Sequence, residues 1–322
     1  MLRKKRGRLV VTKKNEVLLE IPVIKIDGVA IFGNVQVTSQ TLSFLMKEGI
    51  DVNFLSQFGY FKGKVQGQFS KNLFLREEQL NKRNDSRFCL SLSKEIVHGK
   101  LVNSRTLAQK WERDGLIQER KNIDLLKQII SSVKNADNLE TLRGFEGSGA
   151  KVYFEIFGRA IKSISSFFSF DGRNRRPPKD PINVLLSLGY TFLQNQVYSA
   201  INIVGLDPYW GFLHSDKYGS PSLVLDMMEE FRPVIVDRLV FRCIKSGFIK
   251  KEHFTQEGEK VLLSKEGFEI FVKTYDDFLK TSIKHPLENN NCTYFRSMEI
   301  QLRILSGVIT DKIRNYTPFL IK

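Results

Sequence analysis

Cysteine is scarce in this chain of 322 residues, and its three cysteines are scattered. Cys89, Cys243 and Cys292 are odd in number and form no C-x-x-C pair. A common structural zinc site needs paired cysteines, and a disulfide framework needs an even number of them. The sequence therefore argues against both, and it predicts a protein of a reducing, cytoplasmic compartment.

Long apolar runs are also missing. The N-terminal residues MLRKKRGRLVVTKKNE begin like a signal peptide, but their apolar run is only LVV before charge returns. The longest apolar region, residues 181–205, is interrupted by polar residues, among them Asn183, Ser187, Gln194, Asn195, Gln196 and Asn202. This region is typical of a buried helix in a soluble protein rather than of a membrane span, so no membrane partner is expected.

Negative charge is the scarcer sign. Lys and Arg number 50 and Asp and Glu 35, which gives a formal net charge of +15 at pH 7. Such an excess attracts polyanions, and nucleic acid is the commonest of these. An anionic membrane surface is the rival partner, but the chain has no strongly basic amphipathic helix with Trp and Leu on its other face.

The hydrophobic pattern divides the chain into a β-rich part and a helical part. The short β-branched runs RLVVTKK, EVLLEIPVIKID and VAIFGNVQVT are separated by turn signals. A short helix, SQTLSFLMKEG, follows, with Ser39 as its N-cap and Gly49 as its stop. From about residue 75 the period is helical. We therefore predict an α+β fold, with a small N-terminal β-rich domain (residues 1–84) and a larger, mostly α-helical C-terminal domain (residues 85–322).

Two prolines mark helix starts in the C-terminal part. Asp180-Pro181 and Ser220-Pro221 each have the pattern of an N-cap followed by the first helical residue. The second of these helices, SPSLVLDMMEEFR, should end or kink near Arg232, before Pro233. On a helical wheel its acidic residues lie opposite its apolar ones; they are Asp226, Glu229 and Glu230. They form either a solvated acidic face or carboxylates kept close by a cation.

Glycines surround a single carboxylate in GFEGSGAKVYF, residues 144–154. Glycine clusters at helix entrances usually bind phosphate, which Glu146 would repel unless it held a divalent cation. His214, at the end of DPYWGFLH, and a carboxylate of DMMEE could complete a mixed oxygen and nitrogen site. Such a site suits Mg²⁺ or Mn²⁺ better than zinc. The alternatives are a hydrogen-bonded loop histidine, and glycines on a helix face that another backbone approaches closely.

The Pro-rich segment GRNRRPPKDP is a candidate DNA-binding loop. Its basic residues are Arg173, Arg175, Arg176 and Lys179. Arginine forks and lysines suit the phosphate backbone of nucleic acids. The alternative is a solvated surface turn with a basic bias.

Four segments occur here in the order that they have in the CRISPR-associated spacer-acquisition integrase, the universal CRISPR adaptation nuclease. They are LRGFEGSGAKVYFE, RNRRPPKDPINVLLSLGYTFL, DPYWGFLHSDKYGSPSLVLDMMEEFRPVIVDRLV and FRSMEIQLRIL, and the chain resembles this family over most of residues 140–305. The resemblance implies an N-terminal β domain and a C-terminal helical domain. It also implies metal ligands at Glu146, His214 and Glu229, and a supporting catalytic carboxylate at Asp226.

The resemblance further implies the partners: a homodimer that joins a small companion CRISPR adaptation protein, captures a short DNA fragment and inserts it into the repeat array. Because no Ser, Tyr or Cys nucleophile motif is present, we expect direct transesterification, in which the 3′-hydroxyl of the incoming DNA attacks a phosphodiester of the repeat. Attack by water would give endonuclease activity. The alternatives are a non-catalytic basic DNA-binding scaffold and a metal phosphoesterase that acts on RNA or nucleotides.

Overall fold

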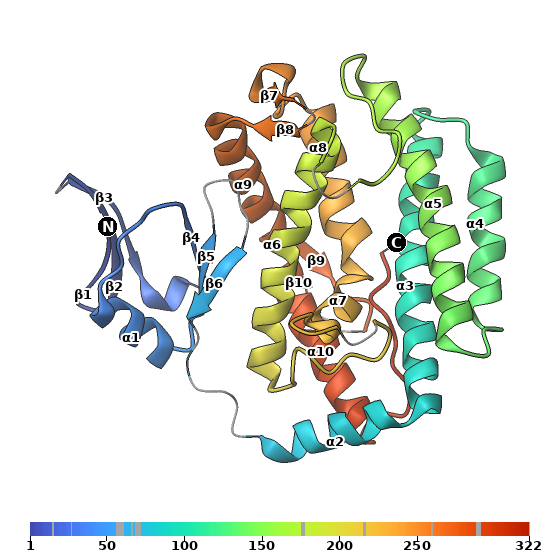
Figure 1. The fold of residues 1–322 in the computed structure, drawn as a ribbon, viewed down its shortest axis with the longest axis horizontal. Coiled ribbons are helices and arrows are strands. Elements are labelled where there is room, and N and C mark those ends of the chain that lie inside the picture. Colours follow the sequence, from blue (N-terminus) through green and yellow to red (C-terminus); the bar gives the residue numbers. More distant parts are fainter. Residues whose placement is uncertain are drawn as a thin grey trace. The chain divides into compact units, whose positions relative to one another are not determined.

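The structure is a computed structural model of the chain. It describes residues 1–14, 16–26, 28–55, 61–65, 67, 72–174, 178–214, 217–258, 260–287 and 291–321. The chain divides into two compact units, Met1–Lys71 and Asn72–Lys322 (Figure 1). Strands dominate the first unit and helices the second, which confirms the predicted α+β class.

The helix α2 (Leu73–Asn84) lies between the division at residues 71 and 72 and the boundary expected at residue 84. It packs on α3 (Ser86–Arg113) and α10 (Tyr294–Ile309). The buried Gln79 side chain donates hydrogen bonds to the carbonyl oxygens of Asp207, at 2.9 Å, and Trp210, at 2.8 Å. These contacts hold α2 to the C-terminal unit.

Two small sheets and one helix form the N-terminal unit. Its elements are β1 (Leu2–Lys5), β2 (Arg8–Lys13), β3 (Glu16–Pro22), η1 (Val23–Lys25), β4 (Val29–Phe32), α1 (Ser39–Lys47), β5 (Val52–Leu55) and β6 (Phe61–Val65). The strands β1, β2 and β3 form an antiparallel sheet, and β5 pairs with β4 in parallel and with β6 antiparallel. The buried side chains of Leu2, Leu45 and Val52 belong to one apolar cluster that joins both sheets to α1.

The C-terminal unit contains two groups of helices. Its remaining elements are α4 (Arg120–Val133), α5 (Leu139–Ile164), α6 (Pro181–Val204), α7 (Ser222–Met228), η2 (Arg232–Asp237), α8 (Arg238–Lys245), η3 (Lys251–His253), β7 (Phe254–Glu257), β8 (Lys260–Leu263), α9 (Lys265–Leu279), β9 (Ser282–Lys284) and β10 (Asn291–Thr293). The helices α3, α4 and α5 pack on one another, and α6 packs on α7 and α10. The π-helical segment η2 contacts both α3 and α6, so it joins the two groups.

Helix ends follow the sequence-based predictions only in part. The cap of α6 is confirmed, because Asp180 Oδ1 accepts a hydrogen bond from the Asn183 N–H at 2.8 Å. The predicted N-cap of α1 was wrong by one residue, since Thr38 accepts from the Thr41 N–H and Ser39 is already helical. The Ser220 cap was also wrong: α7 begins at Ser222, and Pro221 precedes it without a side-chain cap.

The helix α7 does not continue to Arg232 as predicted; it ends at Met228. The chain then turns through Glu229 and Glu230, and Pro233 lies in the first turn of η2. A proline is tolerated there because the first N–H groups of a helix have no partner within the helix. The regular α-helix is therefore interrupted at Glu229 rather than at Arg232. Short π-helical turns like those of η2 are frequent at functional sites.

The glycine-rich segment lies within α5 rather than at a helix entrance. A Cβ atom on Gly149 would lie 2.6 Å from Leu101 Cδ2 of α3, so the glycine lets the two helices approach closely. This contact is one turn from Glu146 and brings that carboxylate near Lys100. Among the described residues, no helix has the length and apolar character needed to cross a membrane.

Candidate active site

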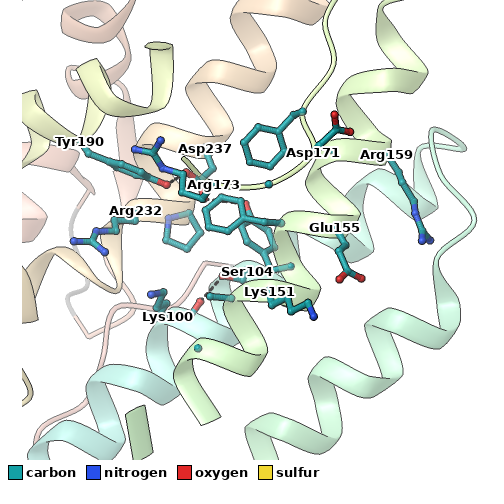
Figure 2. Close-up of a pocket in the computed structure, with 18 of the residues that line it drawn as sticks. Lys100, Ser104, Lys151, Glu155, Arg159, Asp171, Arg173, Tyr190, Arg232 and Asp237 are labelled. Atoms are coloured by element: carbon teal, nitrogen blue, oxygen red, sulfur yellow. Dashed lines mark hydrogen bonds between the residues drawn. The ribbon is translucent and has the colours of Figure 1, made fainter. Parts of the chain in front are cut away.

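A cleft of about 910 Å³ opens in the C-terminal unit (Figure 2). Its walls come from α3, α5, α6 and η2 and from the segments that follow α5 and precede α7. Glu146, His214 and Glu229 all line this cleft, although they are up to 83 residues apart in the sequence, counted from 146 to 229. The structure thus brings together three of the four residues predicted for the site, and the fourth, Asp226, contacts His214.

The acidic residues of the α7 region are buried. The exposed fraction is 0% for Asp226, 2% for Glu229 and 0% for Glu230. A solvated acidic face, which the helical wheel left open, is therefore wrong. Burying a carboxylate costs free energy unless hydrogen bonds or cations compensate it, and each of the three has a different set of such partners.

Asp226 organises the segment that carries His214. Its Oδ2 accepts hydrogen bonds from the N–H groups of Phe212, at 2.6 Å, and Leu213, at 3.0 Å. Its Oδ1 lies 2.9 Å from the His214 N–H and 2.7 Å from His214 Nδ1. The approach needs a glycine at position 211, because a Cβ there would lie 2.8 Å from Asp226 Oδ2. Asp226 thus fixes both the backbone and the ring of His214.

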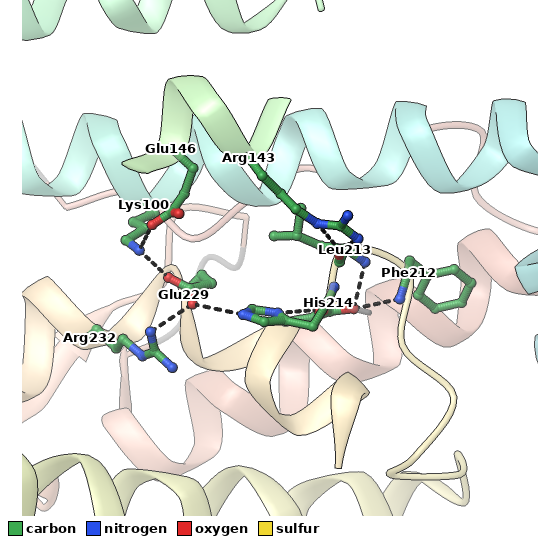
Figure 3. Close-up of polar contacts among 9 residues, drawn as sticks. Lys100, Arg143, Glu146, Phe212, Leu213, His214, Glu229 and Arg232 are labelled. Carbon is green, nitrogen blue, oxygen red and sulfur yellow. Dashed lines mark hydrogen bonds and ion pairs between the residues drawn. The ribbon is translucent and has the colours of Figure 1, made fainter. Parts of the chain in front are cut away.

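The helix α5 holds the same segment from the other side. Arg143 donates to the Leu213 carbonyl oxygen from Nε, at 3.0 Å, and from Nη2, at 2.5 Å (Figure 3). Arg143 is three residues before Glu146, so the helix that carries Glu146 also anchors the segment that carries His214.

Glu229 lies among three positively charged or chargeable groups. Its carboxylate oxygens are 2.5 Å from Lys100 Nζ, 2.7 Å from Arg232 Nη1 and 3.7 Å from His214 Nε2. Burial by itself would raise the pKa of this carboxyl, but Arg232, Lys100 and His214 together lower the pKa to about 2. Glu229 is therefore ionised throughout the physiological range.

The Lys100 ammonium also contacts Glu146 Oε1, so it bridges the two carboxylates (Figure 3). Burial would lower the pKa of Lys100, but Glu229 and Glu146 raise it above its usual value. In the described part of the chain, no three His, Cys, Asp or Glu side chains form a group ready to hold a metal ion. As the side chains stand, lysine supplies the cation between the carboxylates.

The donors present fit a hard divalent cation. Carboxylate oxygens of Glu146 and Glu229 flank a position that already attracts a positive charge. His214 has the arrangement of a metal-binding histidine, because Asp226 holds its Nδ1 and its Nε2 faces Glu229. Two carboxylates and one imidazole suit Mg²⁺ or Mn²⁺. Binding such an ion would require the Lys100 ammonium to move aside.

Sequence reasoning missed several residues of this site: Lys100, Arg232, Tyr153, Tyr190 and Asp237. Asp237 accepts hydrogen bonds from the hydroxyls of Tyr190, at 2.5 Å, and Tyr153, at 3.0 Å. Burial raises the pKa of Asp237 to about 6, although these two hydrogen bonds lower it. The only sequence signal was that the stretch around Asp237 lies in a segment used for the resemblance, and nothing marked it as part of a cleft.

The two described basic residues of GRNRRPPKDP, Arg173 and Lys179, have different surroundings. Arg173 Nη1 donates to Asn183 Oδ1 at 2.6 Å, and Nη2 donates to Ser187 Oγ at 3.0 Å, so this guanidinium supports α6. The Arg173 guanidinium also lies over the ring of Tyr190, with its Cζ 5.2 Å from the ring centroid. The Cζ of Arg232 lies 5.5 Å from the same centroid (Figure 2). Lys179 is exposed. Arg175 and Arg176 lie outside the described residues, and DNA contact by any of the four stays a prediction.

Comparison with known proteins identifies the family. The family model described as CRISPR associated protein Cas1 matches residues 1–277. The CRISPR-associated endonuclease Cas1 3 of Thermus thermophilus is 34% identical over 328 residues, which cover 100% of this chain and 94% of that protein. A Cas1 protein from Thermotoga maritima has a similar structure, with a TM-score of 0.84, 26% identity, and coverage of 98% of this chain and 96% of that one.

A chain of a partial Cas6-RT-Cas1–Cas2 complex is also similar, with a TM-score of 0.70 and 25% identity over 100% of this chain and 96% of that one. The family model covers most of the chain, and the Thermus relative covers all of it. The chain belongs to the Cas1 family of CRISPR-associated endonucleases.

Proposed function

We propose that this protein is a divalent-metal-dependent DNA endonuclease and integrase that inserts short DNA fragments into a CRISPR repeat array. One observation carries the proposal: Glu146, His214 and Glu229, from three separate segments, line one cleft in which Lys100 already places a positive charge between the two glutamates, and His214 Nε2 lies 3.7 Å from Glu229. Membership of the Cas1 family supports the reaction class.

Glu146, Glu229 and the Nε2 atom of His214 would hold the ion, which we propose to be Mg²⁺ or Mn²⁺. When bound, such an ion polarises a phosphoryl oxygen and makes the attacking hydroxyl easier to deprotonate. Asp226 keeps His214 in the tautomer whose Nε2 is free to bind. Arg232 and Lys100 supply positive charge for the DNA phosphate, and Arg232 also keeps Glu229 ionised.

The reaction proposed is a transesterification. The 3′-oxygen of the incoming DNA forms a bond to a phosphorus of the repeat, the bond from that phosphorus to the repeat's own 3′-oxygen breaks, and the proton passes to this leaving oxygen. The number of phosphodiesters is unchanged, so no external energy source is needed. With water in place of the 3′-hydroxyl, the same site cleaves DNA.

A covalent tyrosine intermediate is disfavoured by the state of the two tyrosines that line the cleft. Burial raises the pKa of Tyr153 and of Tyr190 well above the usual range, and the neighbouring Asp237 raises both further. Both hydroxyls already donate to Asp237. They are therefore held protonated and turned toward a carboxylate, which makes them poor nucleophiles.

The protein partners proposed are a second copy of this chain and a small companion adaptation protein. One similar solved chain is part of a complex that contains Cas2, which supports such a companion. DNA is the proposed nucleic-acid partner, and the net charge of +15 favours its binding.

The test is a strand-transfer assay with labelled DNA and a repeat-containing target, in Mn²⁺, in Mg²⁺ and in EDTA. Glu146→Gln, His214→Gln and Glu229→Gln should each abolish joining and cleavage while DNA binding survives. Glu140→Gln, an exposed carboxylate on the same helix as Glu146, is the matched control and should retain activity.

Wild-type rates in all three cleft variants would refute the site. A purified protein that binds DNA, but neither cuts nor joins it in Mn²⁺, would support the non-catalytic scaffold instead. Faster turnover of single-stranded RNA than of duplex or branched DNA would support the phosphoesterase alternative.

A further inference from the structure

The last described residues of the chain, 316–321, lie against the short junction that carries Glu229. We call residues 316–321 the C-terminal segment. It follows α10 and runs along α3 (Figure 1). Tyr316 and Phe319 are buried, with exposed fractions of 4% and 2%. The C-terminal segment is therefore anchored in the packed interior of its unit by these two side chains.

The carboxylate of Glu230 binds the C-terminal segment. Its Oε1 accepts a hydrogen bond from the Tyr316 hydroxyl, and its Oε2 accepts one from the Phe319 N–H, each at 2.5 Å. Gln301 of α10 lies 3.4 Å from both oxygens and donates to the Tyr316 hydroxyl oxygen at 2.8 Å. Glu230, which is fully buried and follows Glu229, thus accepts hydrogen bonds from this segment with both carboxylate oxygens.

Three hydrogen bonds of Asn103 and one ring stack also connect the same junction to the C-terminal segment. Asn103 Nδ2 donates both to the Glu230 carbonyl oxygen, at 2.9 Å, and to the Phe319 carbonyl oxygen, at 2.8 Å. Asn103 Oδ1 accepts from the Ile321 N–H at 3.0 Å. The ring of Phe319 stacks on Phe231, with centroids 5.2 Å apart. Both residues that follow Glu229 are therefore held by the C-terminal segment or by the side chain that binds it.

The junction needs such support because it lies between two kinds of helix. The helix α7 ends at Met228, and the π-helical turns begin at Arg232. Glu229, Glu230 and Phe231 lie where the hydrogen-bond pattern changes, so a regular helix does not fix their backbone by itself. The close fit extends to α3, where a Cβ on Gly99 would lie 2.6 Å from Pro318 Cβ.

We propose that the C-terminal segment is a positioning element for the Glu229 carboxylate, acting through Glu230, Asn103 and Phe231. It touches none of the reacting groups. It fixes the backbone from which Glu229 reaches Lys100, Arg232 and His214. The structural part of this proposal stands on the contacts alone, and its effect on the reaction rests on the proposed metal-dependent function.

The test uses the full chain with Tyr316→Phe, which removes one hydroxyl and leaves the ring in place. Tyr275→Phe is the matched control, because Tyr275 is equally buried on α9, and its hydroxyl oxygen has no hydrogen-bond partner among the described residues. Phe319→Leu is a second variant, which removes the ring stack but leaves the backbone bond to Glu230.

Two readouts separate positioning from general stability. Hydrogen exchange, followed by mass spectrometry, should accelerate in peptides that cover residues 226–232 in Tyr316→Phe and Phe319→Leu but not in Tyr275→Phe. The Mn²⁺ concentration for half-maximal strand transfer, and the dissociation constant for Mn²⁺ measured by calorimetry, should rise by about tenfold, as for other groups that support a metal ligand. DNA affinity should stay at the wild-type value.

Unchanged exchange at residues 226–232 together with unchanged Mn²⁺ binding in both folded variants would overturn the proposal. A lower melting temperature with wild-type Mn²⁺ affinity would also overturn it, since the segment would then be merely structural. If the wild-type protein itself showed no Mn²⁺ dependence, the proposed function would fail, and the exchange data would still decide whether the segment holds the junction.

Discussion

Asp226 lies 2.7 Å from Nδ1 of His214, and the opposite ring nitrogen of His214 faces Glu229 at 3.7 Å. A buried carboxylate at Nδ1 keeps the proton on that nitrogen and leaves Nε2 as the electron-pair donor. The same carboxylate accepts the backbone N–H groups of residues 212–214. Asp226 therefore sets both the position and the tautomer of the histidine, without itself facing the cleft.

Replacing Asp226 by asparagine should weaken metal binding. The amide cannot accept all four hydrogen bonds, and its NH₂ group would face an N–H donor. Loss of such a supporting carboxylate typically costs about 10- to 100-fold in metal affinity, and we expect a fall of this size in Mn²⁺ affinity for Asp226→Asn. Calorimetric titration with Mn²⁺ measures it. Asp276→Asn, at an exposed ion pair on α9, is the control; equal Mn²⁺ affinities in the two variants would contradict the role given to Asp226.

Removing the Lys100 charge should tighten metal binding while it impairs strand transfer. The ammonium lies between Glu146 and Glu229 and competes with any ion that these carboxylates bind. A like charge about 4 Å away costs roughly 4 kcal/mol at an effective dielectric constant of 20, so Mn²⁺ affinity in Lys100→Met should rise by at least about tenfold.

The metal-free Lys100→Met protein should also melt at a lower temperature, because two neighbouring carboxylates then lack their shared cation, and Mn²⁺ should restore the melting temperature. Lys110→Met, an exposed lysine on the same helix, controls for the loss of one positive charge. Weaker Mn²⁺ binding in Lys100→Met would show that the lysine orders the site instead of competing for it.

The free energy of unfolding should depend on pH because of Asp237. Burial raises the pKa of this carboxyl from 3.8 to about 6. Because the folded protein holds the proton more tightly than the unfolded chain does, the contribution of Asp237 to the free energy of unfolding is complete below about pH 4. It is lost as the pH rises through 6.

The rise in the pKa of Asp237 from 3.8 to about 6 corresponds to about 3 kcal/mol in the free energy of unfolding. Urea unfolding of the wild type and of Asp237→Asn at pH 4 and pH 7 measures it, since asparagine does not titrate. The wild type should lose up to about 3 kcal/mol relative to the variant between these two values. A difference that stays constant with pH would show that Asp237 is ionised in the fold throughout.

Substitutions of Lys179 and Arg173, the two described basic residues of GRNRRPPKDP, should affect DNA binding differently. With +15 net charge, affinity should fall steeply as salt increases. If exposed Lys179 contacts a phosphate, Lys179→Gln reduces the slope of log affinity against log salt by about 1. Arg173→Gln should mainly lower the melting temperature, because Arg173 holds Asn183 and Ser187. Lys265→Gln, at an exposed ion pair on α9, is the control, and a slope in Lys179→Gln equal to that of the control would place Lys179 away from the DNA.

The division into a β-rich N-terminal part and a mostly helical C-terminal part was readable from the sequence, because each period depends on near neighbours in the chain. The short strands β7 to β10 within the helical part were not predicted. The cap at Asp180 was readable for the same reason, since its partner is the N–H three residues later. The end of α7 was not, because the change to π-helical turns at Arg232 depends on contacts of η2 with α3 and α6. Because Pro233 was interpreted only as a helix breaker, the end of the helix was predicted near Arg232 instead of at Met228.

The site shows the same division. Glu146, His214 and Glu229 could be named through the family resemblance, while spacing alone left open whether Glu229 lies on a solvated face or beside a cation. That Glu229 is buried and ionised, with a pKa of about 2, depends on Lys100 of α3 and Arg232 of η2. No pattern in the sequence pairs Lys100 with Glu229, because their contact exists only when α3 packs against η2.

The sequence by itself determined the class of the fold, the family and three of the residues that meet in the cleft, Glu146, His214 and Glu229, since these follow from local periodicity and from motifs in a fixed order. Tertiary structure alone decided the charge state of those residues and their support by Asp226, Lys100 and the C-terminal segment. The physical reason is that electrostatic and hydrogen-bond energies depend on distance in space and on exclusion of water, and both are set by packing between segments remote in the chain.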